Sequence, residues 1–140
     1  MTAELKVISD LRPAVENADI VSTATSAREA IIEGQWMQSC THIDLIGSYT
    51  PDIRETDNIL MAKGSIFVDY RDTTIQCVGD LTRPIANGTI TAADIRGDLY
   101  DLVNGSAQGR RNSSDITIFK NGGAAHLDLM VADYVTRVVS

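Results

Sequence analysis

Cysteine, proline and aromatic residues are scarce in this 140-residue sequence, which has 2 cysteines, 3 prolines, 2 phenylalanines and 1 tryptophan. Cys40 and Cys77 form no CxxC pair and only 2 histidines accompany them, so a structural zinc site is not expected. We expect two reduced, partly buried thiols in a cytoplasmic protein. The 44% hydrophobic and 22% charged content is otherwise that of an ordinary soluble globular domain.

Basic residues and long apolar runs are also in short supply. Lys and Arg number 12 against 19 Asp and Glu, giving a net charge of −7, and the one basic doublet, Arg110-Arg111, has Asp115 close by. This balance argues against a nucleic-acid partner, which needs clustered cations. No apolar run approaches the ~18–20 residues of a membrane span, and the polar start "MTAELK" does not resemble a signal peptide. Neither nucleic acid nor membrane is expected as a partner.

Short apolar runs rich in β-branched residues predict the strands. They cover residues 19–25, 42–47, 65–70 and 116–120, with a weaker run at 5–8. Most are almost continuously apolar, which is typical of strands covered on both faces of a parallel sheet. Repeats, low-complexity tracts and proline-rich linkers are absent, so a single domain over residues 1–140 is predicted.

Predicted helices alternate with these strands, over residues 9–18, 52–64, 91–105 and 124–139. Ser9 or Asp10 is a candidate N-cap for the first, and Gly64 is suited to end the second. Thr91 followed by Asp94 is a variant of the capping box that opens the third. The alternation predicts an α/β fold, with a parallel sheet of four or five strands and helices on both faces.

Functional loops of an open parallel sheet lie at the carboxyl ends of its strands. The hydroxyls of "STATS" (22–26) could meet a sugar or a phosphate, or could cap the next turn. In "VDYRD" (68–72) two carboxylates could divide acid and base roles, but an exposed ion-pair cluster around Asp69 is the favoured interpretation. His42 shares a strand face with Asp44, and a structural role is favoured for it. No catalytic residue is assigned.

Gly122 and Gly123 stand between a predicted strand and a predicted helix. Strand, glycine turn and helix N-terminus are the usual elements for holding a phosphate or a nucleotide. The phosphate-binding fingerprint GxGxxG, however, occurs nowhere in the 140 residues. The two glycines alone leave open whether this turn is a ligand site or a tight corner.

Six motifs follow one another along nearly the whole chain: "ADIVSTATS", "GQWM", "HIDLIGSYTPDIRE", "FVDYRD", "GDLTRPIANGTIT" and "GRRNSSDITIFKNGGAAHLDLMVADYV". Together they resemble the ornithine cyclodeaminase/mu-crystallin family, which includes alanine dehydrogenases and imine reductases. The resemblance implies the later part of a Rossmann-like NAD(P)(H)-binding domain that lacks the first mononucleotide-binding half. Family members are about twice as long, with an amino-terminal substrate and dimerisation domain and a GxGxxG loop upstream of the matching part.

The resemblance also implies a site for NAD(H) or NADP(H) at the strand ends. Its residues here are Thr23, Thr25, Ser26, Gly47, Ser48, Tyr49, Asn121, Gly122 and Gly123. Tyr49 stands where cyclodeaminases carry a catalytic Asp, and a phenol, which stays protonated at pH 7, cannot replace a carboxylate base. Gly122 replaces a larger residue of the family turn and is expected to loosen that corner.

We therefore expect a truncated, stand-alone relative of this family without independent catalysis, which keeps at most a weak nucleotide or small-molecule site. One alternative is a subunit of a split NAD(P)-dependent oxidoreductase or ornithine cyclodeaminase, completed by another chain. Another is an interaction module that acts through its exposed sheet edge. Because strand edges and large apolar surfaces are normally covered, a homodimer or a partner chain is expected at that edge.

Overall fold

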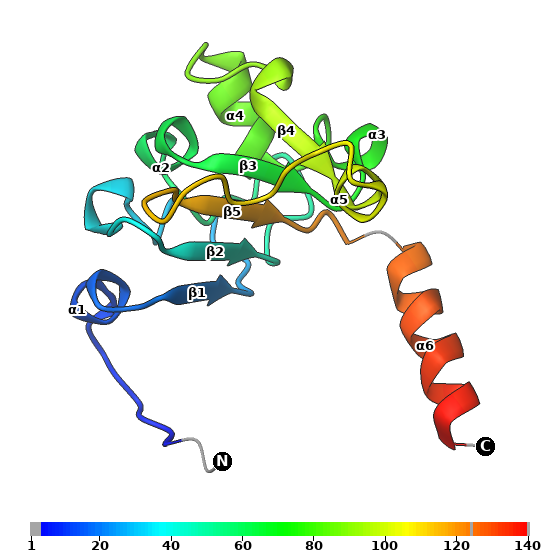
Figure 1. Ribbon diagram of the computed structural model, residues 1–140. Helices are drawn as coiled ribbons and strands as arrows, with labels where there is room; N and C mark the ends of the chain where they lie inside the picture. The colour runs from blue at the N-terminus through cyan, green and yellow to red at the C-terminus, as the bar shows by residue number, and fades with distance from the viewer. Residues whose placement is uncertain (1–3, 124, 140) are drawn as a thin grey trace.

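The computed structural model describes residues 4–123 and 125–139. Its centre is a five-stranded sheet in which every neighbouring pair of strands is parallel (Figure 1). The strands stand in the order β1-β2-β5-β3-β4. Their bounds are Ile20–Thr23 (β1), His42–Leu45 (β2), Ser65–Val68 (β3), Ile95–Asp98 (β4) and Thr117–Lys120 (β5). The predicted α/β fold with a parallel sheet is confirmed.

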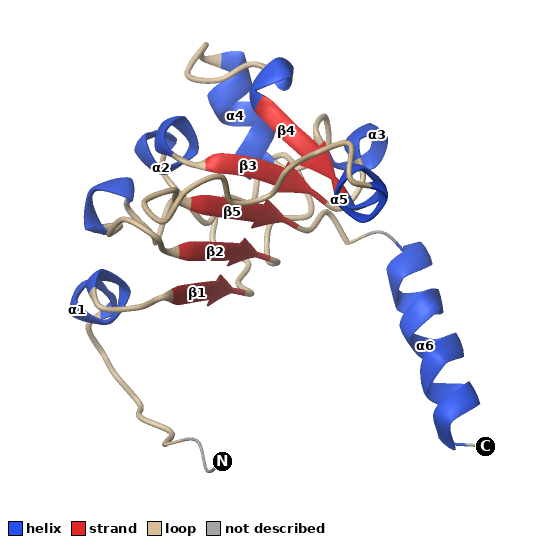
Figure 2. Ribbon diagram, viewed as in Figure 1, coloured by secondary structure: helices blue, strands red, loops and turns tan. Residues whose placement is uncertain are grey.

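Short helices connect the strands, and a longer one follows the last strand (Figure 2). The 3-10 turns are η1 (Gly34–Trp36) and η2 (Ala92–Asp94). The α-helices are α1 (Leu11–Glu16), α2 (Asn58–Lys63), α3 (Arg71–Thr74), α4 (Gly79–Ala86), α5 (Leu99–Asn104) and α6 (Ala125–Val139). Asp10 caps α1 by accepting a hydrogen bond from the backbone N–H of Arg12, as its position predicts.

The helix predicted over residues 52–64 is confirmed only in its last part, α2. The Asp57 side chain caps α2 by accepting from the backbone N–H of Leu60, and Gly64 is the C-cap. Residues before Asp57 instead use their backbone groups to reach other loops: the N–H of Arg54 donates to Ala27 O at 2.7 Å. A capping residue inside the predicted helix therefore marks where it really begins.

The helix predicted over residues 91–105 is wrong in its middle, where the structure has strand β4. Thr91 and Asp94 do form the predicted capping box, but it opens only η2. A second capping box, between Asp98 and Asp101, opens α5. Ile95 and Leu99 stand four residues apart and so imitate helical spacing, and apolar periodicity cannot separate a four-residue strand from a helical turn.

The strand predicted at residues 5–8 is also wrong. This segment has no regular structure, and Leu5 and Val7 are each 89% exposed. Apolar and β-branched composition favours a strand only where a neighbouring strand and a packing surface exist. Helices α3 and α4 fill a stretch, residues 71–86, to which the sequence assigned no element.

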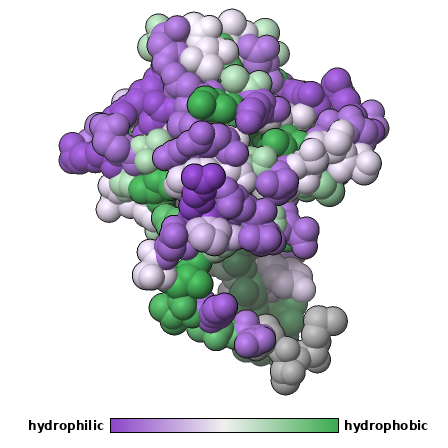
Figure 3. Space-filling model, turned by 90° about the vertical axis from the view of Figure 1, so that its left-hand side faces the viewer, coloured by the Kyte–Doolittle hydropathy of each residue, from purple (hydrophilic) through white to green (hydrophobic). Residues whose placement is uncertain are grey.

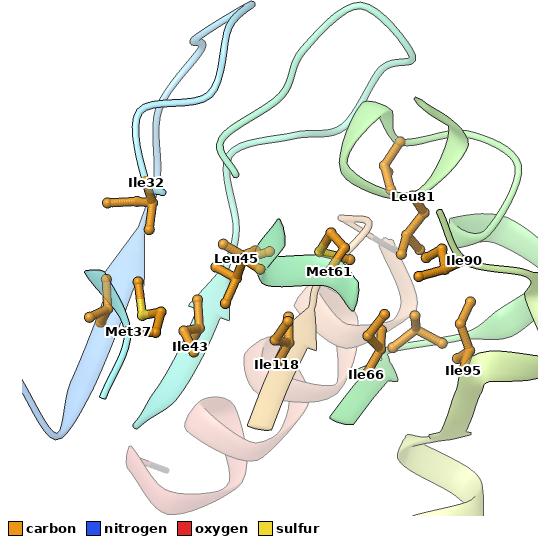
Figure 4. Close-up of a cluster of buried hydrophobic side chains, with 14 of the residues drawn as sticks. Ile32, Met37, Ile43, Leu45, Met61, Ile66, Leu81, Ile90, Ile95 and Ile118 are labelled. Atoms are coloured by element: carbon orange, nitrogen blue, oxygen red, sulfur yellow. The ribbon is translucent and has the colours of Figure 1, made fainter. Parts of the chain in front are cut away.

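The hydrophobic core lies on one face of the sheet. Alternate residues of the central strands, among them Ile43, Leu45, Ile66 and Ile118, are essentially fully buried there beneath α2 and α4 (Figure 4). The opposite face carries Phe67 and Phe119, which line a hollow together with Leu99 and Leu102 of α5. Helices thus cover both faces, although α5 covers only the β3–β4 side.

Apolar side chains are exposed at several places outside this core, among them residues 5–11, helix α6 and strand β1. Helix α6 extends away from the sheet (Figure 1) and has no buried residue between Ala125 and Val139. Its exposed apolar side chains are Leu129, Met130, Val131, Tyr134, Val135, Val138 and Val139. Figure 3 shows hydrophobic residues gathered at the lower end of the molecule. Ile20 on β1, one of the two edge strands of the sheet, is 68% exposed.

Candidate functional site

Three turns that follow adjacent strands form the candidate site. Because β1, β2 and β5 are neighbours in a parallel sheet, the turns that begin after Thr23, Leu45 and Lys120 leave the same end of the sheet. All nine residues of the predicted cofactor site lie on these strand ends and turns. The sheet order thus brings together segments almost a hundred residues apart in the sequence.

The turns after β1 and β2 are in direct backbone contact. A Cβ placed on Gly47 would lie 2.1 Å from Thr25 O and 2.3 Å from Thr25 N, so only glycine fits at this position. The fully buried carboxylate of Glu55 joins the same two turns. Its Oε1 accepts from the Thr25 N–H at 2.7 Å, and its Oε2 accepts from the Gly47 N–H at 2.8 Å.

The predicted residues of these two turns differ in exposure. Thr25 and Ser26 are exposed, although the Thr25 hydroxyl accepts from the N–H of Ala27 at 3.2 Å and so also caps its own turn. Thr23 is buried, and its hydroxyl makes no hydrogen bond to the described residues. Ser48 is buried too and donates to Ile53 O at 2.6 Å. Tyr49, by contrast, is 61% exposed.

The corner after β5 is tight, so the prediction that Gly122 loosens it is wrong. A Cβ at Gly122 would lie 2.3 Å from Thr74 Oγ1. The Gly122 N–H donates to Asp69 Oδ2 at 2.9 Å, and the Gly123 N–H donates to Asn121 Oδ1 at 2.8 Å. Gly123 has a φ of +80°, a conformation that favours glycine.

Asp69 is part of this corner, which the sequence interpretation missed. It is fully buried and also accepts hydrogen bonds from the Tyr70 N–H at 2.8 Å and from the Thr74 hydroxyl. The expected exposed ion-pair cluster is therefore wrong for this residue, while Arg71 forms its ion pair with Asp101 at 3.5 Å. A carboxylate directly after a continuously apolar strand is the signal that could have identified it.

A buried pair of opposite charges lies beneath the turns. Lys120 is 0% exposed, donates from Nζ to Leu45 O at 3.0 Å and lies 3.9 Å from Asp80 Oδ2. Asp80 Oδ1 accepts from the backbone N–H groups of Glu55 and Thr56 at 2.9 and 3.1 Å. Burial lowers the pKa of the Lys120 ammonium, against the attraction of Asp80. Burial raises the pKa of the Asp80 carboxyl, against the hydrogen bond from the Glu55 N–H.

A mainly apolar pocket of about 250 Å³ adjoins the Gly122 corner. The start of α6 closes it, and the ring of His126 meets the ring of Tyr70 edge-on at a centroid distance of 6.1 Å. The pocket is lined by Asp69, Leu99, Tyr100, Val103, His126, Leu127 and Met130. His126 therefore lines a surface beside the candidate site.

The remaining candidates have structural environments. His42 is half-buried, and its Nδ1 lies 2.8 Å from the Thr117 hydroxyl, in keeping with the favoured structural role. Cys40 and Cys77 are free, and both are exposed rather than partly buried as expected. Within the described ranges no group of three or more His, Cys, Asp or Glu side chains is placed to hold a metal ion. No helix in the described part of the chain is long and apolar enough to cross a membrane.

The ornithine cyclodeaminase/mu-crystallin family model matches residues 1–140, and the chain belongs to this family. It is 53% identical, over 138 residues and 99% of its length, to the Δ1-pyrroline-2-carboxylate reductase of Paracoccus denitrificans. It superposes with a TM-score of 0.86 and 34% identity, over 90% of its length, on a Thermococcus litoralis Δ1-pyrroline-2-carboxylate reductase in complex with NADH and L-proline. An archaeal alanine dehydrogenase dimer with bound NAD gives a TM-score of 0.83 and 27% identity over 91% of the chain.

The matched region is less than half of each relative. The chain spans 44% of the Paracoccus reductase and 39% of each of the two solved chains. The family and the Rossmann-like nucleotide-binding fold predicted from the motifs are confirmed.

Proposed function

We propose that this chain supplies the nicotinamide side of an NAD(P)(H) site in an imine reductase acting on a cyclic imino acid of the Δ1-pyrroline-2-carboxylate type. The convergence of three turns at one end of the sheet carries this proposal, since ligands of parallel sheets bind there. The 53% identity to the Paracoccus reductase supports the substrate class. NADH and NAD in two similar structures support the cofactor.

The residues at the three turns fit the nicotinamide end of such a cofactor. Gly123 has no atom within 4 Å of its Cβ position, so a flat ring can approach that turn closely, whereas Gly47 and Gly122 let the turns pack tightly against Thr25 and Thr74. Thr25 and Ser26 add exposed hydroxyls, and Tyr49 adds an exposed ring. When bound, a nicotinamide cofactor supplies or accepts hydride. The residues of the three turns orient the nicotinamide ring and limit the space around it.

Tyr49 favours reduction over ammonia release. It stands where the family's cyclodeaminases carry a catalytic carboxylate, and a phenol is not the carboxylate base that this reaction uses. A reductase does not need a carboxylate base at this position, because the imine carbon of the substrate is the hydride acceptor. The same substitution thus argues against ornithine cyclodeaminase activity.

We further propose that the 140 residues alone have no reductase or cyclodeaminase activity. The sequence contains no GxGxxG loop to hold the cofactor's phosphates. A second segment with that loop, from another chain, would add its strands at the free edge of β1 and complete the site. This is the split-enzyme alternative. Its complete form would work in the cytoplasm, where free, exposed cysteines stay reduced.

A homodimer or an interaction module is the second candidate function. The exposed apolar side chains of α6 favour it, because contiguous exposed apolar surface usually marks an interface. The outer edge of β1 offers unpaired backbone groups for strand addition. A chain that shows no thermal shift with NAD, NADP or adenine nucleotides in any assembly would favour this candidate over the reductase.

Co-expression with the amino-terminal part of the Paracoccus reductase tests the main proposal. We expect the two chains to co-purify and to oxidise NADH or NADPH when Δ1-pyrroline-2-carboxylate is added, while the 140-residue chain alone does neither. The matched control is the same amino-terminal part with the glycines of its GxGxxG loop replaced by alanine. Activity of the 140-residue chain alone would overturn the need for completion. A co-purified pair that binds no cofactor would overturn the proposed site.

A further inference from the structure

Glu55 is the side chain that connects the two turns predicted to line the cofactor. Each of its carboxylate oxygens accepts one backbone N–H, Oε1 from Thr25 at 2.7 Å and Oε2 from Gly47 at 2.8 Å. We propose that Glu55 is a positioning residue that sets the spacing of these turns for the nicotinamide side of the cofactor. This inference rests on the proposed function and adds to it a residue that does not itself face the ligand.

The position of Glu55 is fixed from below by the buried charges. Asp80 Oδ1 accepts from the Glu55 N–H at 2.9 Å, and Lys120 lies 3.9 Å from Asp80 Oδ2. Lys120 is in turn held to β2 through Leu45 O at 3.0 Å. A continuous series of polar contacts therefore runs from the strand ends, through the interior, to both turns. Any movement of Glu55 would move both turns together.

A carboxylate is the group that this geometry requires. Two N–H donors face the side chain from two different turns, so both of its oxygens must accept. A glutamine of the same shape offers one oxygen and one NH₂, and the NH₂ would face an N–H donor with no acceptor between them. Glycine at position 47 is part of the same arrangement, because a Cβ there would lie 2.3 Å from Glu55 Oε1.

The backbone of Glu55 is held independently of its carboxylate. Its carbonyl oxygen accepts from the N–H groups of Ile31 and Ile32, each at 3.0 Å. Glu55→Gln keeps these bonds and the bond from the Glu55 N–H to Asp80, so we expect the variant to fold. A side chain that only stabilised the fold would change the melting temperature and leave the ratio of KM to kcat unchanged.

The test compares Glu55→Gln with Glu29→Gln, a control on the same side of the molecule whose side chain is 92% exposed. Residue-resolved amide hydrogen exchange is measured on the 140-residue chain, and KM for NADH and kcat are measured on the co-expressed pair. We expect exchange at Thr25 and Gly47 to speed up about tenfold or more in Glu55→Gln, the size of effect expected when a charge-assisted hydrogen bond is lost. KM for NADH should rise by about the same factor, with kcat changed less than about twofold. Glu29→Gln should match the wild type in both measurements.

Each possible result of these two measurements supports or overturns the proposed role of Glu55. Unchanged exchange at both amides would overturn it, and so would faster exchange with an unchanged KM. If the wild-type pair binds no NADH, the proposed function fails and the cofactor role of Glu55 fails with it, while the exchange data still decide whether Glu55 holds the turns. Should Glu55→Gln not fold, Glu55→Asp serves instead. It keeps both carboxylate oxygens and the charge but shortens the side chain by one methylene, so we expect a smaller effect of the same sign on exchange at the two amides and on KM.

Discussion

The carboxyl end of the sheet and helix α6 depart in opposite ways from the usual pattern, in which charged side chains are exposed and large apolar side chains are buried. At the sheet end four ionisable side chains, Glu55, Asp69, Asp80 and Lys120, are fully buried. In α6, seven large apolar side chains are exposed and none is buried in the described part of the helix. The buried charges are tolerated because backbone N–H and C=O groups bind most of their polar atoms, and Asp80 Oδ2, which accepts no hydrogen bond from the described residues, lies 3.9 Å from the Lys120 ammonium. The apolar side chains of α6 beyond Met130 remain 50–80% exposed.

Substitutions at the sheet end should therefore affect the stability of the chain, and substitutions in α6 should affect its association. The charges at the sheet end are held by other groups of the same chain, so changing them should cost stability in the chain by itself. Beyond Met130 the apolar side chains of α6 are 50–80% exposed, so changing them should affect association more than the stability of the chain. Substitutions in the two regions can therefore be told apart by what they alter.

Lys120→Met should have the largest effect. It removes the cation beside Asp80 and leaves that carboxylate buried without a partner of opposite charge. Removing one member of a buried ion pair typically costs about 3–5 kcal/mol. We expect a loss of this size in the free energy of unfolding, measured by urea denaturation.

The double variant Lys120→Met/Asp80→Asn is the matched comparison. An asparagine at position 80 is uncharged and keeps an oxygen to accept from Glu55 and Thr56. We expect it to recover more than half of the loss. A double variant no more stable than Lys120→Met would mean that the lost packing of the lysine, rather than the uncompensated charge, carries the cost.

Gly47→Ala should have an intermediate effect. The added methyl would lie 2.1 Å from the backbone oxygen of Thr25, which cannot rotate away, so the two turns must separate. Overpacking of this kind typically costs about 1–3 kcal/mol. Gly109→Ala is the control, since its nearest contact is a flexible Leu102 methyl at 4.0 Å. Equal melting temperatures for the two variants would contradict the close contact between the turns.

Val135→Asp in α6 should have the smallest effect on the chain itself. Val135 is exposed, and surface substitutions usually change stability by less than about 0.5 kcal/mol. If α6 forms an interface, the same change should weaken association by placing a charge in an apolar contact. Sedimentation equilibrium at tens of micromolar measures this. A wild-type chain that is a clean monomer there would rule out a homodimer.

Much of the fold could be predicted from the sequence because four of the five strands lie in short runs rich in apolar and β-branched residues, although only β3 is buried along its whole length. β4 escaped prediction since it contains Gly97 and lies between two capping boxes that each suggest a helix. The segment at residues 5–8 has the composition of a strand but no neighbouring strand to pair with. Local composition cannot predict that β4 is a strand or that residues 5–8 are not, because both outcomes depend on which segments lie beside them in the fold.

The place of the candidate site was predictable from the strand ends of a parallel sheet, its cofactor role only through the family resemblance, and the side chains beneath the turns were not predicted at all. Glu55 lies in a stretch predicted as helix and Asp80 in one with no predicted element, and neither pattern indicates burial, since Glu and Asp are almost never fully buried without partners. Their partners are backbone N–H groups of turns up to 30 residues away. Lys120 ends an apolar strand, and its burial depends on Asp80, which is distant in sequence but close in the fold.

The place of β5 in the sheet has a consequence for how the chain folds. The last strand in sequence is inserted between β2 and β3, which do not pair with each other. Without residues 117–120 the sheet would consist of two separate pairs, β1-β2 and β3-β4. The pairing of β5 with β2 and β3 joins segments that are far apart in the sequence, and contacts of such high sequence separation slow folding. During synthesis the inner edges of β2 and β3 have no partner strand until residues 117–120 have been made.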